Sequence, residues 1–561
     1  MSRPLSPPSG AAPTALTGAE ALAASAVALL AWIVVLGYAI DRVGMTIVPS
    51  AILLSSAGAT MALSVYLGRR ATWDARELAA FVGVTAAALG WLLWLAWPAL
   101  LPPGRGPDLA HHLLLIDYIE RHWRLVHDAR VEIYLGQMVA YTPGGHILAA
   151  LGGAWAGTDG LHAFYPLIAW SVAIKAGFIF VICCRVVPRG GPRIPFALIG
   201  VLLLFLPRAY LVGSFTHDSF FAQVVSETFA VAMWWAVAAW DEQPWPGAMA
   251  VFAVAGAAAF LTWPVWIGPP VMALVAIVLL REGIPVRRRL AHVALALGPV
   301  VAIAAVYTAG RTGYLQLVRI SAGVSRPVPA DFGWLFLILS AVGLVIAACS
   351  RRARATLLLF GALALQAVTF YALARQNRSE TPYMALKMFY LAIYPSAVVG
   401  ALAVAVAYRA VAQIGDTRRW AERLIWVLVV LAGIVTGRTL VAFRRPTPIV
   451  APPLYLAGQW ARAHVAPACV DYLVADSDAA YWLHLAVLGN RWMSARTRDS
   501  ATFDPHAAIV RWIEPRSLRF AIADVAVIPK PILADVDILA DFGQAVVVRR
   551  RGEAVCPGAE P

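Results

Sequence analysis

Apolar runs long enough to cross a membrane recur along most of the chain, and short polar segments separate them. A run of about 20 apolar residues is the length of a transmembrane helix. The pattern predicts about thirteen such helices, at residues 19–40, 44–67, 78–101, 161–184, 194–213, 219–240, 246–262, 264–280, 290–309, 332–349, 356–374, 386–408 and 424–442. The longest polar interruption, residues 102–142, follows the third run.

Beyond residue 443 the pattern changes to that of a soluble α/β fold. Helical stretches are expected at 454–464 and 479–488, and strands at 470–475, 520–528 and 545–548. The fold class expected is therefore an all-α polytopic membrane protein with a small C-terminal extracytoplasmic α/β domain. We divide it into a disordered cytoplasmic tail (1–18), a membrane domain (19–443, with the large outer loop 102–142) and the α/β domain (444–561).

The amino-acid composition also indicates that most of this chain lies in a lipid membrane. Hydrophobic residues make up 61% of its 561 residues and charged residues 14%, with a mean hydropathy of +0.72. The net charge of +14 would suggest nucleic acid as the partner of a soluble protein. Here the arginines lie in short clusters between apolar runs, which is membrane topology, so no nucleic-acid partner is expected.

The arginine clusters also predict orientation, because cytoplasmic loops of membrane proteins are enriched in basic residues. With the N-terminus inside, five cytoplasmic loops carry Arg69, Arg70 and Arg76; Arg185, Arg189 and Arg193; Arg281 and Arg287 to Arg289; Arg351, Arg352 and Arg354; and Arg418, Arg419 and Arg423. Loop 102–142 and everything after residue 443 then lie outside. Only three of the basic residues are lysines, and alanine is abundant, which resembles the coding bias of a GC-rich bacterium. We therefore expect the membrane to be a bacterial inner (plasma) membrane.

The outer loop holds the first candidate chemistry. Asp108 stands at the start of a predicted surface helix, and His111 and His112 follow on the same face, three and four residues on. A carboxylate beside two imidazoles could accept a proton from a hydroxyl group. The alternative is that Asp108 only caps the helix. His146, after the turn Tyr141 to Gly145, could reach a ligand or simply bond a backbone carbonyl.

Other charged residues at the outer rim are candidate ligand contacts. They are Arg208, His217 and Asp218 between the fifth and sixth runs, and Arg375, Arg378 and Lys387 around the start of the twelfth. An arginine at membrane depth is costly unless it meets an anion, although snorkelling is an alternative for Arg208. Lys387 suits a phosphate or, equally, an interfacial anchor. His217 and Asp218 are weak metal candidates, so no metal site is assigned and a divalent cofactor stays open.

Two pairs of residues are expected to meet. Lys175 and Glu227 lie deep in apolar runs, where a charge needs a partner, so a structural ion pair is the preferred interpretation. Cys469 and Cys556 both lie in the extracytoplasmic part, where a disulfide can form; two free thiols are the alternative. Trp482, Trp492 and Trp512 could stack on sugars, but core packing is favoured for these residues.

The acidic residue early in a large outer loop, the surface helix, the Tyr-x-Pro-Gly-x-His turn and the C-terminal domain together resemble the GT-C superfamily of membrane glycosyltransferases. The arrangement is most similar to bacterial arabinosyl and mannosyl transferases. Two features differ: the loop follows the third run, and Asp108 lacks an acidic neighbour.

This resemblance implies a polyprenyl-phosphate-linked sugar donor, a glycan, lipid or protein acceptor, and an inverting reaction with Asp108 as general base. The three histidines would orient substrates, and Arg208 and Lys387 would hold the lipid phosphate. Two alternatives remain: an O-antigen-type polymerase or ligase, and a lipid-linked glycan transporter or flippase, which usually shows inverted repeats.

Overall fold

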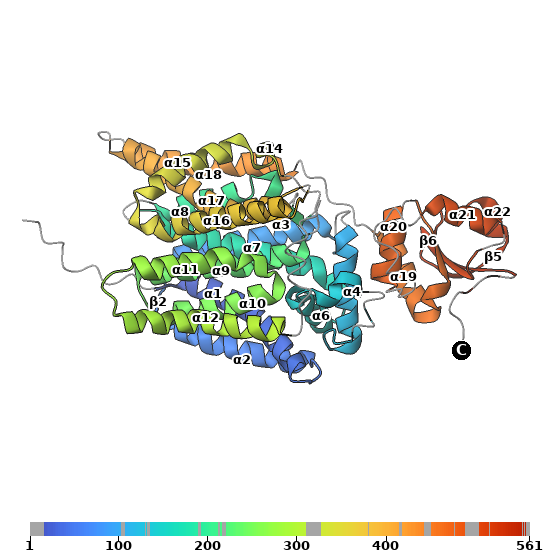
Figure 1. Cartoon of the computed structure of the whole chain (residues 1–561). Helices are drawn as coiled ribbons and strands as arrows, with labels where there is room; N and C mark the ends of the chain where they lie inside the picture. Colours follow the sequence, from blue (N-terminus) through green and yellow to red (C-terminus); the bar gives the residue numbers. More distant parts are fainter. Residues whose placement is uncertain are drawn as a thin grey trace, which may run out of the picture.

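A bundle of long helices forms most of the molecule, and a small α/β region extends from one end of it (Figure 1). The computed structural model describes residues 16–101, 107–128, 131, 135–188, 192–210, 214–215, 220–309, 327–379, 381–413, 418–441, 450–475, 477–488, 504–514, 517–552, 554 and 556. Most of the tail predicted at 1–18 lies outside these residues. The expected fold class, a polytopic helical protein with a small C-terminal sheet region, is confirmed.

Each predicted span overlaps one helix of the bundle. These helices are α1 (Gly18–Arg42), α2 (Pro49–Gly68), α3 (Ala75–Ala96), α7 (Gly160–Val186), α8 (Arg193–Leu204), α9 (Phe221–Glu242), α10 (Pro246–Thr262), α11 (Gly268–Leu280), α12 (Val286–Thr308), α15 (Trp334–Ala348), α16 (Arg354–Gln376), α17 (Tyr383–Ala412) and α18 (Arg418–Val441). Within the described residues, eight helices are long and apolar enough to cross a membrane. The chain is therefore a multi-pass membrane protein.

Shorter elements connect the bundle helices. They are β1 (Leu16–Thr17), β2 (Ala71–Thr72), α4 (Pro107–His122), η2 (Gly136–Ala140), α6 (Gly144–Ala156), η4 (Pro264–Trp266), α14 (Pro329–Phe332) and η5 (Arg351–Ala353). Strands β1 and β2 pair in parallel over two residues each.

Helix α9 lies at the centre of the bundle, where it packs against α7, α10 and α11. Its apolar window is fully buried, whereas α2 and α3 bury only 17% of theirs. On α2, Leu54 and Met61 are exposed. An exposed apolar face of this length is expected to contact lipid, so α2 and α3 are peripheral helices and α9 is a core helix.

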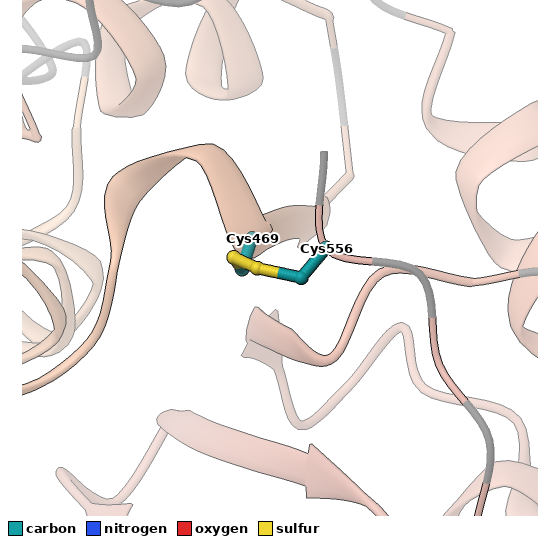
Figure 2. Close-up of a disulfide and its surroundings, with 2 residues drawn as sticks. All are labelled: Cys469 and Cys556. Atoms are coloured by element: carbon teal, nitrogen blue, oxygen red, sulfur yellow. A yellow bond between two sulfur atoms is a disulfide. The ribbon is translucent and has the colours of Figure 1, made fainter. Parts of the chain in front are cut away.

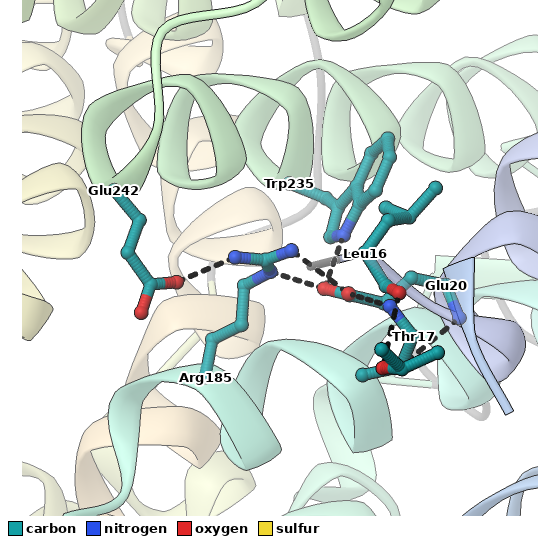
Figure 3. A network of polar contacts seen from close by, with 7 residues as sticks. Leu16, Thr17, Glu20, Arg185, Trp235 and Glu242 are labelled. Atoms are coloured by element: carbon teal, nitrogen blue, oxygen red, sulfur yellow. Dashed lines mark hydrogen bonds and ion pairs between the residues drawn. The ribbon is translucent and has the colours of Figure 1, made fainter. Parts of the chain in front are cut away.

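One end of the bundle is fastened by ion pairs between helix ends (Figure 3). The guanidinium of Arg185, in the last turn of α7, donates to both carboxylate oxygens of Glu20 at the start of α1. It also donates to Glu242 at the end of α9, at 2.5 Å. The indole of Trp235 donates to Glu20 at 3.0 Å. Since Glu20 and Arg185 are both shielded from solvent, removing either charge would leave the other charge buried without this partner.

The opposite end of α1 contacts the segment that follows α4. Asp41, in the last turn of α1, accepts hydrogen bonds from the amide of Leu125 and from Nε2 of His127, both at 2.8 Å. The amide of Ile47 donates to the carbonyl of Trp123 at 2.8 Å. Helix α4 therefore lies at the end of the bundle remote from Glu20 and Arg185.

The predicted pair of buried charges is confirmed. Nζ of Lys175 on α7 lies 2.8 Å from a carboxylate oxygen of Glu227 on α9, and both side chains are buried. The hydroxyl of Tyr394 on α17 donates to the same oxygen at 2.6 Å. The cluster thus joins three helices that are not consecutive in the sequence.

The C-terminal region contains a four-stranded mixed sheet in the order β3-β4-β6-β5. Its elements are α19 (Pro452–His464), η6 (Pro467–Cys469), β3 (Val470–Leu473), α20 (Ser477–Trp482), η7 (Leu483–Val487), α21 (Pro505–Ile513), β4 (Phe520–Asp524), α22 (Lys530–Ala534), β5 (Val536–Asp541) and β6 (Ala545–Arg550). Strands β3 and β4 are parallel, and β6 is antiparallel to both of its neighbours.

A disulfide joins Cys469, just before β3, to Cys556 (Figure 2). Trp482 and Trp512 are buried, in agreement with core packing, and the indole of Trp512 donates to Asp471 at 3.0 Å. Trp492 lies outside the described residues.

Candidate active site

Two buried histidines meet where α4 crosses α6. Nδ1 of His112 and Nε2 of His146 are hydrogen bonded at 2.9 Å. The side chain of Phe221, at the start of α9, packs edge-on against both rings. The structure therefore brings together two of the histidines that the sequence analysis proposed separately.

Close packing at the start of α6 fixes the position of His146. The hydroxyl of Thr142 donates to the carbonyl of Thr262, at the end of α10, at 2.7 Å. A Cβ on Gly144 would lie only 2.8 Å from the carbonyl oxygen of Leu261. A larger residue at Gly144 would separate α6 from α10, so the glycine in this turn is a packing requirement.

Lys387 lies beside this pair in a cage of aromatic rings. Its Nζ is 3.9 Å from the ring centroid of Phe220, 4.6 Å from that of Tyr383 and 4.9 Å from that of Trp263. Only 5% of the residue is exposed. Aromatic faces attract a cation, but they do not neutralise its charge. The cage thus fixes the position of the Lys387 amine beside the two histidines.

Tyr141 connects the cage with the histidines. Its ring centroid lies 5.2 Å from that of His112, 5.7 Å from that of His146 and 6.0 Å from that of Trp263. Among the described residues, no hydrogen-bond partner is found for the buried indole nitrogen of Trp263. A buried donor of this kind is costly unless it meets an acceptor.

Burial keeps both imidazoles neutral. It lowers the pKa of His146 to about 3. Burial also lowers the pKa of His112, and the nearby positive charges of protonated His146, His111 and Lys387 lower it further. At neutral pH the pair can therefore donate and accept hydrogen bonds, while Lys387 supplies the positive charge.

Asp108 is the second residue of α4, one helical turn before His112. Its side chain lies outside the described residues. Residues four apart on a helix share a face, so its backbone position is on the His112 side of α4. Nε2 of His111 is hydrogen bonded to the hydroxyl of Tyr481 on α20, at 2.9 Å.

The remaining candidates are not drawn into this cluster. Helix α8 ends at Leu204 and not near residue 213, so Arg208 lies beyond the helix and is exposed. The expectation that it is an arginine buried in a helix is wrong. Arg375, in the last turn of α16, and Arg378, just after it, are exposed as well. His217 and Asp218 lie outside the described residues.

A divalent metal would need more ligands than this cluster shows. In the part of the chain that the structure describes, no three His, Cys, Asp or Glu side chains gather in a way that could hold a metal ion. His112 and His146 supply two nitrogen ligands at most.

The C-terminal region contacts the bundle beside the site, at what we call the α4–α19 junction (Asp117, Glu120, Asp159, Tyr455 and Arg462). Arg462 on α19 donates to Asp117 on α4. The hydroxyl of Tyr455 donates to Asp159, which caps α7. The amide of Gly160 bonds the carboxyl of Glu120. A Cβ on Gly160 would lie 3.1 Å from the Glu120 carboxyl, so the glycine permits this close approach.

The pKa values of the two junction carboxyls Glu120 and Asp159 are shifted in opposite directions. Burial, with the nearby Asp159 and Asp117, raises the pKa of Glu120 to about 8. Burial also raises the pKa of Asp159, but hydrogen bonds from His162 and Tyr455 outweigh it and hold that pKa below its ordinary value. At neutral pH the junction therefore contains a Glu120 carboxyl that is mostly protonated.

Sequence reasoning did not assign two of the three rings around Lys387, those of Phe220 and Trp263. Trp263 stands at the break between two short apolar runs, where α10 ends and η4 begins. That break was a usable signal, because an irregular backbone at membrane depth is tolerated only inside protein or beside a cavity. Tyr383 was predicted to lie next to Lys387, because it precedes Lys387 by four residues on one helix. Phe220 carried no such signal, since aromatic residues are common throughout the chain.

Neither a family model nor a curated protein sequence matches this chain. The comparison with solved structures finds a similar fold in two membrane glycosyltransferases, which agrees with the sequence resemblance to GT-C enzymes. One similar structure is that of ArnT from Cupriavidus metallidurans, crystallised with undecaprenyl phosphate. It is 14% identical with a TM-score of 0.51, over 83% of this chain and 97% of ArnT.

A second similar structure is the oligosaccharyltransferase of Archaeoglobus fulgidus, at 13% identity and a TM-score of 0.46, over 79% of this chain and 69% of that one. At such identities the likeness describes the fold alone.

Proposed function

We propose that this protein is a membrane glycosyltransferase that moves a sugar from a polyprenyl-phosphate-linked donor to an extracytoplasmic glycan, lipid or protein acceptor. The observation that carries the proposal is the caged ammonium of Lys387 beside the His112–His146 pair. Residues from five separate elements (α4, α6, the α10–η4 break, the segment before α9, and α17) converge on this point.

The proposed location is a bacterial inner membrane with the N-terminus in the cytoplasm. The arginine-rich loops support this orientation, and α4 lies at the end of the bundle remote from Arg185. The site and the C-terminal region would then face the extracytoplasmic side. No nucleotide pool exists there, so a lipid-linked sugar is the donor that can reach the site, laterally through the bilayer.

Lys387 is the proposed phosphate contact. A lysine is a compact point charge that binds phosphate through charge-assisted hydrogen bonds. The surrounding rings would accommodate the apolar start of a polyprenyl chain, and the indole N–H of Trp263 would donate to a phosphate oxygen. ArnT, whose fold is similar, was crystallised with undecaprenyl phosphate. Arg208, Arg375 and Arg378 are proposed as outer contacts of the donor or acceptor.

The proposed reaction is a single displacement with inversion. The acceptor hydroxyl attacks the anomeric carbon while the bond from that carbon to the phosphate oxygen breaks. The hydroxyl proton passes to the carboxylate of Asp108, which acts as general base. The electron pair of the broken bond remains on the polyprenyl phosphate, and Lys387 stabilises the added charge.

Neutral His112 and His146 would orient the acceptor or donor hydroxyls, because each can donate one hydrogen bond and accept one. His111, bonded to Tyr481, would link α4 to the C-terminal region, which we propose holds the acceptor.

The test is transfer of radiolabelled sugar by the purified protein in lipid nanodiscs, from a panel of polyprenyl-phosphate sugars. Asp108→Asn and Lys387→Met should abolish or strongly reduce transfer. Lys530→Met removes an exposed lysine on α22 and is the matched control, which should keep full activity. Correct folding of each variant is checked by size-exclusion chromatography and thermal unfolding.

Three outcomes would contradict the proposal in different ways. Full transfer by Asp108→Asn would remove that residue from its proposed role. Transfer of a preassembled glycan, and not of a single sugar, would favour the polymerase or ligase reaction. Movement of labelled lipid between leaflets without any transfer would favour a flippase.

A further inference from the structure

A groove in the C-terminal region is lined mainly by arginine. It has a volume of about 380 Å³, and its lining comprises Arg519, Asp537, Arg549, Arg550 and Arg551, with Gly552 and Ala554. Strand register explains the gathering: Arg549 pairs with Phe520, next to Arg519, and also with Asp537, while Arg550 pairs with Val536. The last residues of β6 thus meet the first residues of β4 and β5.

The groove has an excess of positive charge. Among the described residues, four guanidinium groups and one carboxylate line it, which gives these residues a net charge of +3. Asp537 accepts hydrogen bonds from Arg549 at 2.9 Å and from Arg551 at 2.7 Å. One carboxylate shared between two arginines cannot neutralise both, so the pairing orients them and leaves charge for a ligand.

The other two arginines are held differently. Arg550 donates to the carbonyl of Trp512 at 3.0 Å and to the hydroxyl of Ser517 at 2.6 Å, which are neutral acceptors. The guanidinium of Arg519 lies 5.8 Å from the ring centroid of Phe520. Among the described residues, no carboxylate pairs with Arg519, and its side chain is exposed. Within the described part of the chain, two of the four guanidinium groups therefore have no carboxylate partner.

We propose that this groove binds an anionic glycan, through carboxylate or phosphate groups that the arginines contact in pairs. Planar guanidinium groups match these anions in geometry as well as charge. The volume is at the lower end of the range of small-molecule sites, which suits one charged sugar unit of a longer chain. Of the described residues that line it, none has an apolar side chain larger than that of Ala554.

This lack of apolar lining favours a glycan over a membrane surface. Proteins that lie on anionic bilayers combine basic residues with apolar side chains that enter the acyl region. The groove offers the basic residues alone. The proposal depends only on the C-terminal region, so it stands or fails independently of the proposed transfer reaction.

The experiment measures binding of fluorescent oligogalacturonate and of a phosphorylated mannan to the full-length protein in phosphatidylcholine nanodiscs. Arg519→Gln should weaken binding of the better probe about tenfold, the effect of losing one charge-assisted pair. Lys530→Gln removes one exposed positive charge elsewhere in the same region and should leave binding unchanged. Binding should also weaken as salt is raised.

Three results would overturn the proposal. The first is that neither anionic glycan binds at low salt. The second is an equal loss of affinity in Arg519→Gln and Lys530→Gln, which would mean that binding depends on the total charge of the region and not on the groove. The third is binding to phosphatidylglycerol vesicles that Arg519→Gln weakens, with no binding of either glycan, which would assign the groove to a lipid surface.

Discussion

Glu120 makes the α4–α19 junction sensitive to pH. In an unfolded chain its carboxyl loses its proton near the ordinary value of 4.5, whereas in the folded protein burial and the nearby Asp159 and Asp117 raise its pKa to about 8. Between these two values the folded state binds more protons than the unfolded state. Stability should therefore fall as pH rises through this window and become constant above about pH 8.

The magnitude follows from the two pKa values of Glu120. A pKa difference of one corresponds to about 1.4 kcal/mol, so a rise from 4.5 to about 8 sets an upper limit of roughly 5 kcal/mol. Glu120 is partly solvent-accessible, which screens the interaction, so an effect of about 2 kcal/mol is a better expectation. Glu120→Gln keeps an acceptor for the amide of Gly160 and removes the titration.

Several charged or titratable groups face Glu120 and could also contribute to the pH dependence of stability. They are Asp117 and Arg121 on α4, Asp159 and His162 at the start of α7, and Tyr455 and Arg462 on α19. All of them are retained in Glu120→Gln, so the difference between wild type and variant isolates this one carboxyl. Glu282→Gln, at an exposed loop position, is the matched control.

The assay is the apparent Tm in nanodiscs between about pH 5 and pH 9. Wild type and Glu120→Gln should have similar values near pH 5, and the variant should be more stable by a few degrees at about pH 9. Glu282→Gln should follow the wild type throughout. Parallel curves for wild type and Glu120→Gln would refute the reasoning, since they would mean that Glu120 ionises alike in both states.

Four further predictions follow from the site and the bundle. Asp108→Asn should lower kcat by about 10²- to 10⁴-fold with little change in KM, measured by steady-state sugar transfer. Lys387→Met should raise the KM for the polyprenyl donor about tenfold or more, and an unchanged KM would exclude the phosphate contact. Lys175→Met should destabilise the bundle by about 3–5 kcal/mol because Glu227 is left buried and unpaired, and adding Glu227→Gln should recover part of the loss in thermal unfolding. Replacing Cys469 and Cys556 by serine should cost about 2–4 kcal/mol, seen as faster proteolysis of the C-terminal region only.

Hydropathy located the bundle helices because each must satisfy its backbone internally in lipid, which forces long apolar runs. The exception is the span expected at 194–213, since α8 ends at Leu204 although apolar residues continue. Hydropathy alone could not show this end, because Phe205 and Leu206 are as apolar as the helix; Pro207 was the usable signal. In the C-terminal region, β5 (Val536–Asp541) was missed: its sequence contains two aspartates, which weaken the apolar pattern, and the strand forms by pairing with β6 along its length.

The site was predictable residue by residue but not as an assembly. His112, His146 and Lys387 were each chosen for carrying polar chemistry at the outer rim, and the structure places them together. Which rings surround Lys387 depends on how α9, α17 and the α10–η4 break pack, and no local pattern encodes that. Arg208 was expected inside the membrane because the span was predicted to end at residue 213. Helix α8 ends at Leu204 instead, so that expected position was wrong.

The Lys175–Glu227–Tyr394 cluster has a consequence for how the protein is made. When α7 leaves the insertion machinery, α9 has not been synthesised, so Lys175 would enter lipid unpaired at a cost of about 2.5–3.5 kcal/mol. Glu227 arrives 52 residues later and Tyr394 a further 167 residues on. We therefore expect α7 to be retained beside the translocon until α9 emerges, and the buried cluster to be completed only when α17 docks.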